Sequence, residues 1–140
     1  MDTNCIISIF GKQFDGEGEP ARMELVTAGD YSDSEEGAEF SYEETELTGL
    51  EGTRTTFRVM PDYITMTREG KVNSEMIFEA GKKHFFAYDT PFGAFTMGIN
   101  THQLHSRLNE NGGDVDIRYA IDMESNIVSK NEFHINIRKA

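Results

Sequence analysis

The sequence lacks tryptophan, contains three prolines and has a single cysteine, Cys5. One cysteine cannot form a disulfide within the chain, and this usage is typical of a reducing compartment. The first residues lack a basic region followed by an apolar segment of signal-peptide length. No later apolar run approaches the roughly 18 residues of a membrane-spanning helix. From these absences we expect a cytoplasmic protein that does not insert into a membrane.

Basic residues are scarce in the first third of the chain. The whole sequence has 13 basic and 25 acidic residues, a formal charge of -12. Residues 1–53 contain 14 of the acidic residues against two basic ones, Lys12 and Arg22, whereas residues 54–140 contain 11 of each. A negative surface repels phosphate backbones and anionic membranes, so we expect neither as a partner. Two interpretations remain: a solvated surface that keeps the protein soluble, and a docking surface for a basic partner.

What the chain does have is apolar residues at every second position, the pattern of β-strands with one buried face. The clearest case runs through Val115, Ile117, Tyr119, Ile121 and Met123. Comparable segments cover residues 5–14, 22–31, 40–43, 53–59, 63–69, 76–80, 85–89, 95–101 and 133–137. Gly, Pro and Asn turn signals separate these segments, which is typical of antiparallel sandwiches and barrels.

Two segments carry more specific expectations. In residues 85–89 the alternation predicts that Phe85 and Ala87 face the core. In residues 101–109, Leu104 and Leu108 lie four positions apart, so this is the one segment whose spacing fits a helical turn.

The succession of predicted strands along the chain predicts an all-β protein with a single domain covering residues 1–140. A run of about 8–10 antiparallel strands with one apolar face leaves exposed edges unless it closes on itself. We therefore predict an antiparallel up-and-down (meander) barrel rather than a two-sheet sandwich. A barrel of this size either fills its interior with side chains or holds one small ligand.

Turn and strand motifs follow a recognisable order along nearly the whole chain. They are Lys12-Gln13, Glu24-Leu25-Val26-Thr27, Tyr42-Glu43, Thr53-Arg54-Thr55-Thr56, Thr90-Pro91-Phe92-Gly93, and Gly112-Gly113 before the strand with Tyr119. In this order they resemble the YwiB-like family, small uncharacterised bacterial proteins described as calycin-like (lipocalin-like) β-barrels. The resemblance implies an up-and-down barrel in the cytoplasm. It brings no established activity, so it transfers no catalytic residue.

Acidic residues continue the apolar face of one predicted strand. If Phe40 and Tyr42 point inward, a period of two sends Glu44 and Glu46 the same way. An uncompensated buried charge is costly, so each carboxylate must pair with a cation or reach water.

The next two strands supply partners for these acids. Thr55 shares the face of Phe57, and Arg68 continues the face of Ile64 and Met66. Three interpretations follow: acids in water at the rim of the barrel, an internal structural ion pair with Arg68, and a ligand site. In the last, Glu44, Thr55 and Arg68 orient a ligand while aromatic and methionine side chains supply non-directional affinity.

A ligand in the barrel interior would contact these polar groups and the rings near them. The candidate residues are Tyr42, Glu44, Glu46, Thr55, Phe57, Arg68, Phe78 and Phe95.

The leading hypothesis is a non-catalytic barrel that binds a small apolar or mixed ligand. A second hypothesis is a protein-interaction module that uses the acidic surface of residues 1–53. A third is an enzyme whose carboxylates at the barrel mouth act as general acid and base. The sequence has no nucleophile elbow or phosphate loop, and its four histidines lack zinc-site spacing. We therefore assign no catalytic residue, no metal site and no cofactor.

Overall fold

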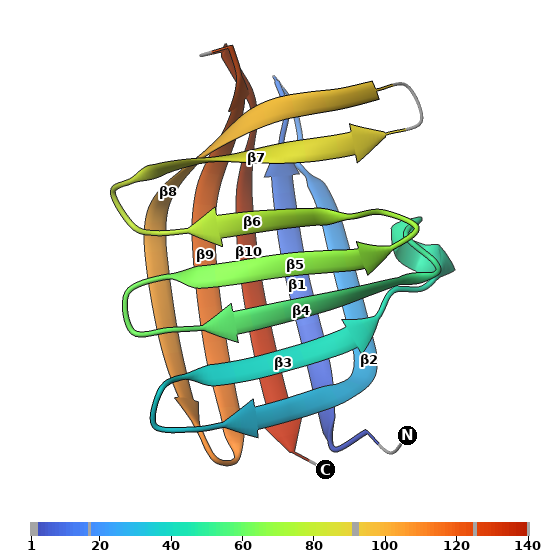
Figure 1. Ribbon diagram of the computed structural model, residues 1–140, viewed down its shortest axis with the longest axis vertical. Helices are drawn as coiled ribbons and strands as arrows, with labels where there is room; N and C mark the ends of the chain where they lie inside the picture. Colours follow the sequence, from blue (N-terminus) through green and yellow to red (C-terminus); the bar gives the residue numbers. More distant parts are fainter. Residues whose placement is uncertain (1–2, 17, 91–92, 125, 140) are drawn as a thin grey trace.

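The described residues form ten strands that follow one another along the chain, as the period-two pattern predicted (Figure 1). The computed structural model describes residues 3–16, 18–90, 93–124 and 126–139, so Pro91 and Phe92 of the predicted turn lie outside the described residues. The strands are β1 (Cys5–Phe14), β2 (Ala21–Asp33), β3 (Ala38–Glu43), β4 (Thr53–Val59), β5 (Ile64–Gly70), β6 (Ser74–Phe78), β7 (Lys83–Thr90), β8 (Gly93–Asn109), β9 (Gly112–Met123) and β10 (Asn126–Lys139). A short 3-10 helix, η1 (Glu46–Thr48), lies between β3 and β4.

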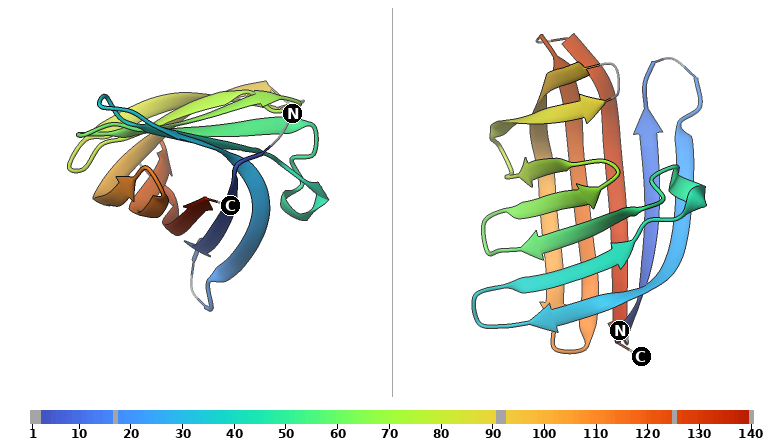
Figure 2. Two further views of the ribbon diagram at one scale, coloured as in Figure 1. Left: turned by 90° about the horizontal axis from the view of Figure 1, so that it is seen from below. Right: turned by 45° about the vertical axis from the view of Figure 1, so that its right-hand side comes forward.

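The strands form one antiparallel sheet in the order β6-β5-β4-β3-β2-β1-β10-β9-β8-β7. Except for β6 and β7, neighbours in the sequence pair as hairpins, and the first strand pairs with the last, with Cys5 opposite Lys139 and Phe14 opposite Lys130. The two edge strands, β6 and β7, are consecutive in the chain and contact one another. The sheet therefore wraps into a nearly closed barrel with two facing walls (Figure 2), which confirms the predicted meander barrel.

The long strand β2 takes part in both walls. Its residues up to Gly29 pair with β1, and its residues from Asp30 onward pair with β3. A Cβ atom on Gly29 would meet the side chain of Ile7 and would lie 2.5 Å from the carbonyl oxygen of Ser41. The absence of a side chain therefore lets β2 approach the Ile7 side chain of β1 and the backbone of β3 closely, at the point where β2 changes partners.

Aromatic rings fill much of the barrel. Phe40 and Phe57 stack with centroids 4.9 Å apart and planes at 12°. A second group crosses the interior from β6 to β10: Phe78 lies 4.8 Å from Tyr119, which lies 5.8 Å from Phe133. Phe78 and Tyr119 lie on β6 and β9, which are distant in the sequence and not paired in the sheet, so their contact holds the two walls of the barrel together.

Two expectations about β7 and β8 are wrong. On β7, Phe86 is buried and Phe85 is 67% exposed, so the alternation runs in the opposite phase to the predicted one. Residues 101–109 extend β8 and form no helical turn. A shift in register between Thr101 and Gln103 marks a bulge, after which Leu104 pairs with Ile117 and Leu108 with Gly113. A spacing of four is even, so it fits one face of a strand as well as a helix.

An ion pair on the outer face ties β7 to β9 across β8. Lys83 Nζ lies 2.9 Å from Asp122 Oδ2, and the same carboxylate oxygen accepts a 2.8 Å hydrogen bond from Asn100 Nδ2. A Cβ atom on Gly98 would lie 2.5 Å from both Asp122 Oδ1 and Lys83 Cε, so glycine leaves room for the pair to cross β8. The Lys83 hydrogen bond is the main reason that the pKa of Asp122 lies below its ordinary value.

This lowered pKa predicts how pH changes stability. Because the folded state favours the ionised carboxylate, Asp122 stabilises the fold above its ordinary pKa of about 4, and this contribution is lost as pH falls through the lower folded pKa. Lys83→Met should lower the free energy of unfolding by about 1 kcal/mol at pH 7, as measured with urea. The difference in this free energy between variant and wild type should become smaller below about pH 4. Arg118→Met, which removes an exposed pair with Glu132, is the control. A deficit that does not change with pH would contradict this assignment.

Candidate functional site

Four polar side chains form a row across the inner face of β3 to β6. The register of three successive hairpins sets Tyr42 opposite Thr55, Thr55 opposite Arg68, and Arg68 opposite Ser74. Tyr42 and Thr55 are buried, and the side chain of Arg68 is 22% exposed. The pairing therefore brings together groups that lie up to about thirty residues apart in the sequence.

Glu44 points into this row from the end of β3. Its backbone N donates a 2.8 Å hydrogen bond to the carbonyl oxygen of Thr53, which continues the pairing with β4 by one residue. The Glu44 side chain therefore stays on the face of Tyr42, and only 1% of it is exposed. The Thr55 hydroxyl donates a 2.5 Å hydrogen bond to Glu44 Oε2, and Arg68 Nε lies 3.8 Å from the same oxygen.

Three buried polar atoms in this row lack a hydrogen-bond partner among the described residues: Glu44 Oε1, Arg68 Nε and Ser74 Oγ. Most buried polar atoms in proteins have a partner, because leaving one unpaired costs free energy. Glu44 and Arg68 are oppositely charged, so their attraction offsets part of this cost, but it satisfies neither orphaned atom. The pair therefore retains one free acceptor and one free donor.

Tyr42 completes the polar group. Burial raises the pKa of its phenol well above the ordinary value, and the neighbouring Glu44 carboxylate raises it further. The hydroxyl consequently stays protonated at any physiological pH and is able to donate or accept a hydrogen bond.

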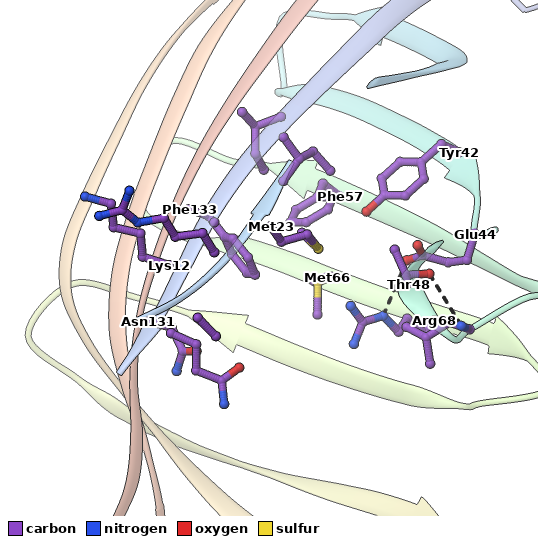
Figure 3. A pocket seen from close by; sticks show the side chains of 17 residues that line it. Lys12, Met23, Tyr42, Glu44, Thr48, Phe57, Met66, Arg68, Asn131 and Phe133 are labelled. Atoms are coloured by element: carbon purple, nitrogen blue, oxygen red, sulfur yellow. Dashed lines mark hydrogen bonds and ion pairs between the residues drawn. The ribbon is translucent and has the colours of Figure 1, made fainter. Parts of the chain in front are cut away.

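A cavity of about 220 Å³ lies beside these groups, between one end of β1, β2 and β10 and the facing strands β3 to β5. Glu44, Arg68 and Tyr42 line it on one side, and Thr48 of η1 lines it as well. In the view of Figure 3, apolar side chains lie between this polar group and Asn131 and Lys12. The apolar lining consists of Ile9, Met23, Leu50, Phe57, Met66, Phe133 and Ile135, with Ala21.

Glycine in the middle of β1 shapes the floor of the cavity. Gly11 is buried, and a Cβ atom there would lie 2.9 Å from Cε1 of Phe133. The Phe133 ring consequently lies directly over the β1 backbone and forms part of the lining. A glycine inside a strand is the signal that predicts such a close approach.

Most of the predicted site residues lie at or beside the cavity. Tyr42, Glu44, Phe57 and Arg68 line it, and Thr55 is fully buried behind Glu44. Phe78 faces the interior and is fully buried, but it contacts Tyr119 in the core and does not line the cavity.

The structure contradicts the interior position of Glu46 and Phe95. β3 ends at Glu43 and the chain turns into η1, so the period of two does not extend to Glu46, whose residue is exposed. Phe95 is 42% exposed on β8. The pairing of β8 with β9 begins only at Gly98, so Phe95 lies in the part of the β7–β8 hairpin that extends beyond the wall.

Sequence reasoning missed the cavity residues of β1, β2 and β10, which include Gly11, Met23, Asn131 and Phe133. Alternation predicts which face of a strand is buried, but it does not tell which strands meet across the interior. Among these residues only Gly11 carried a signal of its own, as a glycine within a strand.

The alternatives to a ligand site receive less support from the geometry. Arg54 pairs with Asp30 and Glu43, and Arg58 pairs with Glu39, so bases of the later chain neutralise some acids of residues 1–53. Glu46 does not join Glu44 at the cavity, so the two acids do not form a facing pair there. Within the described part of the chain, no three His, Cys, Asp or Glu side chains are grouped so that they could hold a metal ion.

Comparison with known proteins places the chain among uncharacterised proteins. Residues 7–135 match a family model described as a domain of unknown function (DUF1934). The crystal structure of the ywiB protein from Bacillus subtilis superposes with a TM-score of 0.86 at 21% identity, over 99% of this chain and 92% of that one. The search of curated proteins gave no match. In the described residues, no helix has the length and apolar character needed to cross a membrane.

Proposed function

The chain belongs to the DUF1934 family, whose description names no activity, and on this premise we propose from the geometry that the protein binds a small ligand in its barrel cavity. The ligand has an apolar body and a polar end, and binding involves no chemical step. The observation that carries the proposal is the buried Glu44–Arg68 pair. An oxygen and a nitrogen of this pair have no hydrogen-bond partner among the described residues, and both residues line a cavity.

The cavity sets the size of the ligand. An apolar protein cavity of about 150 Å³ holds one benzene molecule. In proportion, the 220 Å³ cavity holds about nine non-hydrogen atoms. The ligand is therefore smaller than most drug-sized molecules, which occupy pockets of about 300 Å³ or more.

The lining separates the roles of the residues. Met23, Phe57, Met66 and Phe133 supply contact area, so affinity for the apolar body comes from burial of its surface. Glu44 and Arg68 fix the orientation of the polar end, because desolvated charged groups discriminate strongly between matched and unmatched partners.

The test is occupancy of the cavity by a small aromatic probe. Toluene should raise the melting temperature of the wild-type protein, and native mass spectrometry of freshly purified protein should detect any adduct that is lost on denaturation. Ala21→Trp, at an exposed position that lines the cavity, should fill the mouth and abolish the shift. Val26→Trp, on the outer face of the same strand and 71% exposed, is the matched control. Equal shifts in wild type and Ala21→Trp would show that the probe binds elsewhere.

A further inference from the structure

The chemistry of the ligand's polar end follows from the two orphaned atoms, provided that the cavity binds a ligand as proposed above. Glu44 Oε1 only accepts hydrogen bonds, because a carboxylate has no proton to donate. Arg68 Nε only donates, because a guanidinium has no acceptor. The Thr55 hydroxyl already occupies Glu44 Oε2, so Oε1 is the oxygen that remains. A matching ligand group must therefore present one donor and one acceptor.

The charges decide which groups of this kind fit. The polar end of the cavity contains one negative and one positive charge, with Arg68 Nε 3.8 Å from Glu44 Oε2. Two further cations, Lys12 and its cross-strand partner Arg22, line the other end. An anionic ligand would approach the Glu44 carboxylate, which is 1% exposed and so poorly screened by water. A cationic ligand would approach Arg68 in the same way. Either ion would upset a balanced pair, whereas a neutral group would not.

The separation of the two atoms adds a geometric condition. Oε1 and Oε2 belong to one carboxylate and Arg68 Nε lies 3.8 Å from Oε2, so the free acceptor and the free donor lie close together, on two residues that line the cavity. The donor and acceptor of the ligand must then also be adjacent, as they are in an amide. Tyr42, whose hydroxyl stays protonated, lies beside Thr55 and Glu44 and adds a third polar group at this end of the cavity.

We infer that the site recognises a small neutral molecule whose polar end is an amide-like edge, namely a primary amide, a lactam or the edge of a nitrogen heterocycle. The N–H of that edge donates to Glu44 Oε1, and its carbonyl oxygen accepts from Arg68 Nε. The attached ring or chain occupies the apolar part of the cavity, against Met23, Phe57 and Phe133.

Three probes of equal size test the inference: benzamide, benzoate and benzamidinium. Each has nine non-hydrogen atoms and the same ring, and they differ in that one is neutral, one is an anion and one is a cation. Titration calorimetry on the wild-type protein should give a Kd for benzamide at least tenfold lower than for either ion. A lower Kd for benzoate or benzamidinium than for benzamide would overturn the inference.

Two variants assign the preference to the two charges. Glu44→Gln removes the negative charge at constant shape, so benzoate should gain affinity relative to benzamide. Arg68→Met removes the positive charge, so benzamidinium should gain instead. Thermal melts establish whether each variant is folded. If Arg68→Met is not folded, Glu44→Gln alone is enough to test the inference. An unchanged ratio of the benzoate Kd to the benzamide Kd in Glu44→Gln would also overturn the inference.

The experiments distinguish failure of the proposed ligand binding from failure of the amide inference. If toluene binds in a manner that Ala21→Trp abolishes but benzamide shows no preference, the cavity binds ligands and the amide inference is wrong. If Ala21→Trp changes the binding of neither toluene nor any of the three polar probes, the proposed function is wrong, and the amide inference is wrong with it.

Discussion

Replacing Arg68 with methionine is expected to lower the free energy of unfolding by about 3–5 kcal/mol. Arg68 Nε lies 3.8 Å from Glu44 Oε2, and the Glu44 side chain is 1% exposed. Methionine retains much of the apolar volume but leaves the carboxylate buried without a countercharge, and an unpaired buried charge is far more costly than a pair. Urea unfolding at pH 7 measures the loss, provided that the m value stays constant.

Arg58→Met provides the matched control on the outer face of the same barrel wall. Arg58 approaches Glu39 more closely, at 3.2 Å, but the two side chains are 63% and 45% exposed. Water screens this pair, so its loss should cost less than about 1 kcal/mol. If the two substitutions cost the same, burial does not determine the strength of the Glu44–Arg68 interaction.

The double variant Glu44→Gln/Arg68→Met separates charge from packing. Glutamine is neutral and keeps an oxygen that can accept the Thr55 hydrogen bond, so the double variant should recover most of the stability that Arg68→Met loses. A double variant as unstable as the single one would indicate instead that the loss comes from the methylene groups of Arg68, which would contradict the electrostatic account.

The barrel itself was predictable because each strand buries one face. In β9, Val115, Ile117 and Tyr119 are all buried, so a period of two identified both the strand and its inner face. Where two large apolar residues are adjacent, as with Phe85 and Phe86, the period fits in either phase. The outer partner of Phe85 is Lys83, whose Nζ lies 5.2 Å from the ring centroid, and this contact has no signature in the alternation.

The candidate site was predictable as far as strand geometry extends. Glu44 was placed correctly because its backbone still pairs with Thr53, and Glu46 was placed wrongly because the chain has by then turned into η1. The rest of the cavity depends on the pairing of β1 with β10, which joins the two ends of the chain. No local pattern specifies this closure, so Phe133 was predicted as core but not as a wall of the cavity beside Arg68.

Phe78→Ala is expected to destabilise the protein by about 3–5 kcal/mol while changing the Kd for benzamide by less than twofold. Phe78 is fully buried and its ring lies 4.8 Å from that of Tyr119, so truncation opens a void in the core. It does not line the cavity, so the apolar surface offered to a ligand is unchanged. Phe85→Ala, at a 67% exposed position, is the control and should cost about 1 kcal/mol or less.

Phe133→Leu should show the opposite pattern, with a smaller loss of stability and a several-fold weaker affinity for benzamide. Phe133 is half-buried and lines the cavity, and its ring lies 5.8 Å from Tyr119. Tyr119 thus contacts one ring in the core and one that lines the cavity. If Phe78→Ala lowers the affinity for benzamide as much as Phe133→Leu does, the void at Phe78 must change the cavity through a shift of Tyr119. Core packing would then set the shape of the site, and the separation of structural from binding aromatic residues would be wrong.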